Sequence, residues 1–208
     1  MNLNPPPNDA KGLPLFPAAS EQVPVFGGYW LRRLGIWLLR MTGWRMVGEI
    51  PNEKKLVLAA APHTSNWDFI LAMLFVMATG IRISYLMKKE AFIWPFGKLF
   101  MALGGIPLNR KAADDTVEQI TQWYREHDKV WVVITPEGTR GKVERWKTGF
   151  LRLAERADVP VYLVAWDYPT KTIHIGKKWP RTGDHVRDAE GIRDYLCARY
   201  AGRYPENQ

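Results

Sequence analysis

The sequence predicts a single α/β domain, in which a mixed, largely parallel sheet is flanked by helices. Short apolar runs such as Lys55–Ala61 and Val130–Ile134 have the length and composition of buried strands. Amphipathic stretches such as Asp114–Glu126 alternate with these runs, which is the pattern of a layered α/β fold. The chain has 208 residues, of which 47% are hydrophobic, and this suits one domain with a substantial core.

Two segments precede the predicted domain, which spans residues 44–208. Residues 1–28 contain many prolines without periodicity, which indicates an extended or disordered arm. Residues 29–43 include Tyr29–Met41, YWLRRLGIWLLRM, with a basic face and a wide Trp/Leu face. This pattern favours an amphipathic helix in a membrane interface, and the alternative is a core-packing helix whose arginines snorkel to solvent. The basic face consists of Arg32, Arg33 and Arg40.

The first half of the domain alternates strands and helices. Lys55–Ala61 is expected to be a buried strand, ended by a proline and a Thr-Ser-Asn cluster. Asn66–Thr79 is expected to be a helix, because polar residues at its start can cap it. A strand at Ile83–Met87 and a helix at Phe92–Leu103 follow, with Pro95 in the first turn of that helix.

The second half continues the same alternation. Asp114–Glu126 is an amphipathic helix, and Val130–Ile134, VWVVI, is a buried strand. Thr148–Arg156 is expected to be the next helix. The last elements are strands at Val159–Trp166 and Thr172–Ile175 and a helix at Ala189–Tyr200. In such sheets, ligands bind beyond the carboxyl ends of the strands.

Composition limits the possible partners. The net charge of +8 favours anionic partners, such as nucleic acid, acidic lipid or a phosphorylated small molecule. The ten tryptophans suit either a membrane interface or the core.

One cysteine, Cys197, allows no intramolecular disulfide and no Cys-based zinc site. No signal peptide is evident, and no apolar run reaches the roughly 18 residues of a membrane-spanning helix.

A histidine and an aspartate interrupt the apolar run Leu58–Leu74. His63 is expected in the turn after a strand, and Asp68 in the first turn of the next helix, from which its carboxylate can reach the imidazole. A carboxylate on one ring nitrogen fixes the tautomer and makes the other nitrogen a better general base. Taken alone the pair is a weak signal, and a capped helix beside a satisfied histidine is the alternative.

Two further loops carry polar groups after apolar runs. The stretch GGIPLNRKA places Arg110 where it can bind a phosphate with two hydrogen bonds, although a solvated basic turn is the alternative. The stretch VVITPEGTRGK runs from a buried strand into a loop where Thr139 and Arg140 offer donors to anionic oxygens. Glu137 is expected to hold Arg110 or Arg140, or to bond a ligand hydroxyl. An ordinary polar loop is the alternative.

Covalent and metal-assisted catalysis are not expected. None of the serines lies in a G-x-S-x-G elbow, and Cys197 has no histidine near it in sequence. Direct attack by a bound hydroxyl, activated by His63, is the simpler scheme. There is no H-E-x-x-H motif, and the other histidines are isolated, so we expect no metal site.

The ordered blocks HTSNWD, GGIPLNR, PEGTR and VPVYLV resemble the four sequence blocks of the glycerolipid acyltransferase family, which includes the 1-acylglycerol-3-phosphate acyltransferases. The stretch KKEAFIWPFGKLFMALG is also similar to the family's sequence ahead of the second block. The resemblance spans roughly residues 55–166 and implies a glycerol-3-phosphate acyltransferase-like fold.

The resemblance implies a role for each block. His63 would be the general base and Asp68 its orienting partner, without an acyl-enzyme. Backbone N–H groups near His63, or at the start of the following helix, could stabilise the oxyanion. The acyl-donor side would be lined by Val159–Val161. The acceptor site would consist of Arg110, Glu137, Gly138, Thr139 and Arg140.

The resemblance implies acyl transfer from acyl-CoA or acyl-carrier protein to the hydroxyl of a lysolipid. The leading acceptor is 1-acylglycerol-3-phosphate, which would give phosphatidate. We expect no cofactor beyond the thioester co-substrate, no nucleic-acid partner, and peripheral attachment at the cytoplasmic face of the membrane through the Tyr29–Met41 helix.

Two positions depart from the family pattern. Asn109 replaces an acidic residue that commonly precedes the arginine, and Gly141 replaces a serine. Because both changes lie on the acceptor side, another lysolipid, including an amino-acid-containing one, is an alternative acceptor. Two other functions stay open at this point: a basic module that binds nucleic acid or membrane without catalysis, and an esterase that transfers the acyl group to water.

Overall fold

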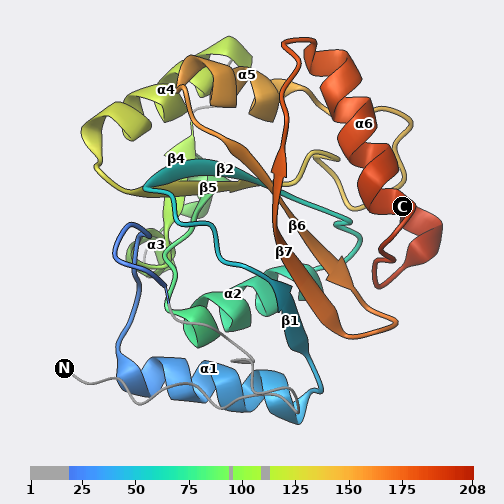
Figure 1. The fold of residues 1–208 in the computed structure, drawn as a ribbon. Coiled ribbons are helices and arrows are strands. Elements are labelled where there is room, and N and C mark those ends of the chain that lie inside the picture. Colours follow the sequence, from blue (N-terminus) through green and yellow to red (C-terminus); the bar gives the residue numbers. More distant parts are fainter. Residues whose placement is uncertain (1–18, 94–95, 109–112) are drawn as a thin grey trace.

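The sheet of the protein is mixed and largely parallel, as the sequence predicts. The computed structural model describes residues 19–93, 96–108 and 113–208 (Figure 1). Within these residues, seven strands form one sheet in the order β1-β7-β6-β2-β5-β3-β4. All neighbouring strands are parallel apart from β6 and β7, which are antiparallel. The strands are β1 (Arg45–Gly48), β2 (Lys55–Ala60), β3 (Ser84–Lys88), β4 (Gly105–Leu108), β5 (Val130–Ile134), β6 (Val161–Asp167) and β7 (Thr172–Trp179).

Helices cover both faces of the sheet. Helices α1 and α2 lie on one face, and α4, α5 and α6 lie on the other (Figure 1). Two short 3₁₀ helices, η1 (Lys89–Ala91) and η2 (Pro205–Asn207), complete the described secondary structure. The α-helices are α1 (Tyr29–Met41), α2 (Trp67–Thr79), α3 (Phe96–Ala102), α4 (Ala113–Glu126), α5 (Gly149–Arg156) and α6 (His185–Cys197).

Strand β2 shows why the core has two parts. Side chains alternate between the two faces of a strand, so a central strand buried on both faces must be apolar throughout. Leu56, Leu58 and Ala60 pack in the core beneath α1 and α2. Val57, Ala59 and Ala61, which directly follows the strand, pack in the core beneath α4, α5 and α6. The continuous apolar run that predicts a buried strand is therefore explained by two covered faces.

The segment ahead of α1 is packed where the structure describes it. Residues 1–18 of the predicted arm lie outside the described residues. The Ala19 amide donates to the Thr79 carbonyl, Val23 is fully buried, and Val25 forms an antiparallel bridge with Ile81. The described part of the arm therefore lies against the domain, and the Val23 N–H donates to the Ser20 carbonyl (3.1 Å) in a turn.

Helix α1 has the predicted bounds and packs on α2 through its buried residues Gly35, Ile36 and Leu39. The prediction of one basic face is wrong for Arg32, because the Arg32 Nε donates to the Ala78 carbonyl of α2 (3.0 Å). None of the described helices has the length and hydropathy needed to cross a bilayer.

Several element boundaries differ from the predictions. Strand β1 was not predicted, since it is short and mostly exposed and so lacks an apolar signature. Strand β7 continues beyond Ile175 to Trp179, because it pairs with β6 along its full length despite its exposed lysines. Helix α6 begins at His185, where the Asp184 carboxylate caps the first turn. Helix α3 begins at Phe96, and Pro95 lies outside the described residues.

The close contact of α1 with α2 predicts that Gly35→Ala lowers the free energy of unfolding by about 1–3 kcal/mol. A Cβ at Gly35 would lie 2.6 Å from the Ala78 amide nitrogen and 2.7 Å from the Met77 Cβ. This clash should outweigh the helix propensity of alanine, which favours it over glycine by about 1 kcal/mol. Gly149→Ala is the control, because a Cβ there meets nothing within 4 Å. Urea unfolding of both variants measures the difference, and equal stabilities would contradict the prediction.

Candidate active site

The site lies beyond the carboxyl ends of β2 and β5. Strand β2 ends at Ala60, the Ala61–Pro62 peptide bond is cis, and His63 stands in the loop before α2. The loop after β5 carries the Pro-Glu-Gly-Thr-Arg block. Strands β2 and β5 are parallel neighbours, so their carboxyl ends deliver both loops to the same edge of the sheet.

The structure brings His63 and Asp68 into contact. The distance from His63 Nδ1 to Asp68 Oδ2 is 3.0 Å, and the Asp68 side chain is 2% exposed. An ionised carboxylate only accepts hydrogen bonds, so the proton of this contact belongs on Nδ1 and Nε2 is left as the basic nitrogen. This geometry is that of an oriented general base.

Asp68 also organises the loop between β2 and α2. Its Oδ2 accepts hydrogen bonds from the backbone N–H groups of Thr64 (3.0 Å) and Ser65 (2.9 Å). Its Oδ1 accepts one from the Tyr168 hydroxyl (2.6 Å). The carboxylate lies in the first turn of α2, where the helix dipole favours negative charge.

Glu137 supports the backbone of His63. Its Oε1 accepts a hydrogen bond from the His63 N–H (2.8 Å), and the residue is 9% exposed. Burial raises the pKa of Glu137 to about 7, although hydrogen bonds from its own backbone N–H and from that of His63 oppose the rise. The expectation that Glu137 holds Arg140 is wrong, because its described partner is the His63 backbone. Among the described residues, its Oε2 is buried without a partner.

Most of the described backbone N–H groups in the loop after β2 and at the start of α2 are already hydrogen-bonded. The N–H groups of His63, Thr64 and Ser65 donate to the carboxylates described above. The Trp67 N–H donates to the Ser65 hydroxyl (3.1 Å). The expectation that N–H groups near His63 stabilise an oxyanion is therefore wrong for these four. Asn66 lines the site, and its side chain makes no capping hydrogen bond.

A cavity of about 640 Å³ opens beside His63. Its polar wall includes His63, Asn66 and Lys147. The volume falls within the usual range for small-molecule sites, roughly 300–1,000 Å³. Most of the remaining wall is apolar and comes from α2, β3, α4 and α5, as in Phe69, Met73, Leu86, Ile120, Phe150 and Leu153.

The predicted acceptor-binding residues are only partly gathered at this cavity. Gly138 lines it. Thr139 and Arg140 are exposed on the same loop, but they are not among the described residues that line the cavity. Arg110 and Asn109 lie outside the described residues. The described residues contain no group of three His, Cys, Asp or Glu side chains able to hold a metal ion.

Lys147 is a cavity residue that the sequence analysis missed. Its backbone N–H donates to the Pro136 carbonyl (2.9 Å), which places it against the Pro-Glu-Gly loop. A Cβ on Gly138 would lie 2.7 Å from the Lys147 Nζ, so glycine leaves room for the lysine side chain. Gly138 also has a φ of 67°, which favours glycine. The only available signal was a lysine just before the start of α5, in the stretch RWKTGF.

Comparisons with known proteins agree with the predicted fold and family. A protein-family model described as Acyltransferase matches residues 45–166, which is more than half of the chain. The crystal structure of the 1-acyl-sn-glycerophosphate (LPA) acyltransferase PlsC from Thermotoga maritima has a similar fold, with a TM-score of 0.53 and 18% sequence identity. The match covers 83% of this chain and 80% of that chain. No curated protein matches the chain.

The sequence left open whether the protein is an enzyme or a basic binding module, and the family match decides this question. The matched segment, residues 45–166, contains His63, Asp68 and Glu137. Because the matching family consists of acyltransferases, a binding module without catalysis is no longer an alternative. The chain therefore belongs to the acyltransferase family, and the protein is an acyltransferase.

Proposed function

We propose that the enzyme moves a fatty acyl group from acyl-CoA or acyl-carrier protein to the hydroxyl of a lysolipid at a membrane surface. The leading acceptor is 1-acylglycerol-3-phosphate, which gives phosphatidate. The observation that best supports this proposal is the His63–Asp68 pair at the edge of a largely apolar cavity that also contains a lysine. The Thermotoga protein with a similar fold is described as an LPA acyltransferase.

The geometry of the pair supports a direct transfer. His63 Nε2 removes the proton of the acceptor hydroxyl as its oxygen attacks the thioester carbonyl. The C–O bond forms, and the tetrahedral intermediate then expels the thiolate as the C–S bond breaks. The thiolate takes the proton from the imidazolium and leaves as a thiol. Asp68 stabilises the imidazolium between these two proton transfers, and no acyl-enzyme is needed.

The apolar wall suits the acyl chain. It is built from four elements that meet beside His63, so a chain lying along it would have its carbonyl near the imidazole. Burying methylene groups contributes about 0.8 kcal/mol each. A cavity of this composition therefore favours a fatty acyl group over a short acyl group.

Lys147 supports an anionic acceptor. It lines the cavity together with His63, and none of the acidic side chains in the described part of the chain forms an ion pair with it. An ammonium group is a common partner for phosphate. We therefore assign the phosphate of the acceptor to Lys147.

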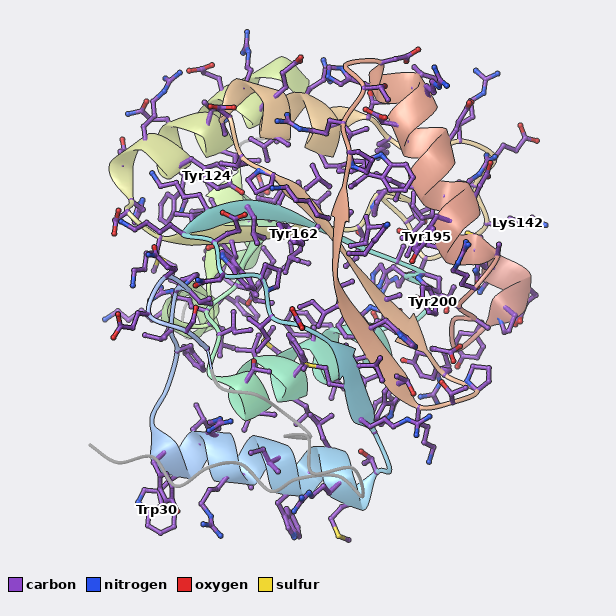
Figure 2. All side chains as sticks on the ribbon, in the orientation of Figure 1. Trp30, Tyr124, Lys142, Tyr162, Tyr195 and Tyr200 are labelled. Carbon is purple, nitrogen blue, oxygen red and sulfur yellow. The ribbon has the colours of Figure 1, made fainter. Side chains whose placement is uncertain are left out.

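The exposed face of α1 supports attachment to a membrane surface. Trp30 is 79% exposed and projects away from the body of the protein (Figure 2). It belongs to a stripe with helical spacing that consists of Trp30, Leu34, Trp37 and Met41. Arg33 and Arg40 are exposed on the same helix and suit anionic headgroups. The helix would lie in the interface, with its buried face kept against α2.

His63→Ala should lower acyl transfer about 100-fold to 10,000-fold, because the reaction loses its general base. His127→Ala is the control, since His127 is exposed and stacks on Trp123. Products would be measured by mass spectrometry with a panel of lysolipid acceptors and both thioester donors. The panel includes an amino-acid-containing lysolipid and a reaction with water alone. Full turnover by folded His63→Ala protein would refute the mechanism, and hydrolysis unaffected by any acceptor would identify an esterase.

Lys147→Ala should raise the KM for 1-acylglycerol-3-phosphate about tenfold or more, because a hydrogen bond to a charged group is worth about 1.5–3 kcal/mol. The KM for uncharged monoacylglycerol should stay within about twofold. Lys142→Ala is the matched control, because Lys142 is an exposed lysine of the same loop (Figure 2). It is not among the described residues that line the cavity. Steady-state kinetics with both acceptors measures this. Equal effects on the two acceptors would count against the assignment.

Replacing both Trp30 and Trp37 by serine should weaken binding to vesicles of phosphatidylglycerol and phosphatidylcholine by about tenfold or more. Val186→Ser is the control, because Val186 is also an exposed apolar residue but belongs to α6. Co-sedimentation of each variant with the vesicles measures bound protein. Unchanged binding by the double variant would remove α1 as the attachment surface.

A further inference from the structure

We propose that Tyr168 is a positioning residue of the catalytic pair, which holds Asp68 in line with His63 and is itself held by the C-terminal segment. The proposal rests on the proposed function, because it concerns the same pair. Tyr168 follows β6 and lies just beyond residues 45–166, the segment that matches the family model. The family blocks therefore do not account for it.

The hydrogen bonds of Asp68 show what Tyr168 adds. Oδ2 faces the His63 imidazole and two backbone N–H groups, whereas the described donor to Oδ1 is the Tyr168 hydroxyl. Their separation of 2.6 Å is typical of a hydroxyl bonded to a carboxylate. A buried carboxylate oxygen without a donor is unfavourable, so loss of this hydroxyl would let the carboxylate turn away from the imidazole.

Tyr168 is suited to be a fixed, neutral donor. Burial raises the pKa of the Tyr168 phenol, and its hydrogen bond to the negative Asp68 raises it further. The hydroxyl therefore keeps its proton at neutral pH. The ring packs edge-on against Trp44, with centroids 5.1 Å apart and planes at 88°. This contact fixes the direction in which the hydroxyl points.

The C-terminal segment ties Tyr168 to the catalytic loop. The Tyr168 N–H donates to the Ala201 carbonyl (3.0 Å), and the Ala201 N–H donates to Asp167 Oδ1 (3.2 Å). Three residues later, the Tyr204 N–H donates to the Thr64 hydroxyl (3.2 Å). One short segment thus contacts both the turn that carries Tyr168 and the loop that carries His63.

Tyr168 acts through Asp68. It is not among the described residues that line the cavity, whereas His63 and Asp68 are. Its hydroxyl keeps the carboxylate against Nδ1 while the imidazole gains and returns the acceptor's proton. Removing the hydroxyl should therefore slow the transfer step and leave substrate binding unchanged.

Tyr168→Phe keeps the ring and its contact with Trp44 and removes only the hydroxyl. We expect kcat to fall about tenfold, with the KM for each substrate within about twofold. The downfield Nδ1 proton resonance of His63, assigned by its loss in His63→Gln, should broaden or disappear in the NMR spectrum. This second readout needs no substrate.

Tyr124→Phe is the matched control. The Tyr124 hydroxyl is also buried and also donates at 2.6 Å, but its acceptor is the Leu56 carbonyl near the start of β2. Tyr124 belongs to α4 and is labelled in Figure 2. This variant should lose stability while keeping kcat and the His63 resonance. An unchanged kcat or an unchanged resonance in Tyr168→Phe would overturn the proposal. Failure of the proposed function would instead appear as turnover by His63→Ala, so the two failures are distinguishable.

Discussion

The buried carboxylate of Asp68 is the group on which the rest of the site depends. A charge removed from water is tolerated only where hydrogen bonds replace its hydration. Asp68 obtains these bonds from the His63 ring, from two backbone N–H groups of its own loop, and from Tyr168. Satisfying one carboxylate therefore shapes the loop after β2, orients the imidazole and fixes the turn after β6.

Two acidic side chains hold His63, and each bonds a different part of the residue. Asp68 bonds the ring, while Glu137 bonds the backbone N–H from the neighbouring loop after β5. Because burial raises the pKa of Glu137 to about 7, a large fraction of this carboxyl carries a proton near neutral pH. The first and third sequence blocks are thus joined directly at the edge of the sheet. The acidic residue of the third block supports the base, and Lys147, from farther along the chain, lines the cavity.

Helix α2 connects the reaction centre with the proposed membrane surface. Its first turn carries Asp68, and its last turns pack against α1 around Gly35. A lysolipid has its hydroxyl near the headgroup and its chain in the bilayer. An enzyme that acts on it therefore benefits from a rigid link between the surface-binding helix and the base. The close packing of α1 on α2 is such a link.

Several parts of this protein could be predicted from local sequence pattern alone. Continuous apolar runs predicted the central strands, and helical periodicity predicted α1 with its bounds. The strand-to-helix connection predicted the contact between His63, in the loop, and Asp68, in the first turn of α2. The contacts of Glu137 and Tyr168 could not be predicted in this way, because their partners lie 74 and 100 residues away along the chain. The same holds for the edge strand β1 and for the position of Lys147. Neither an exposed strand nor a lysine in a loop produces an apolar pattern in the sequence. The position of each therefore depends on the segments that fold against it.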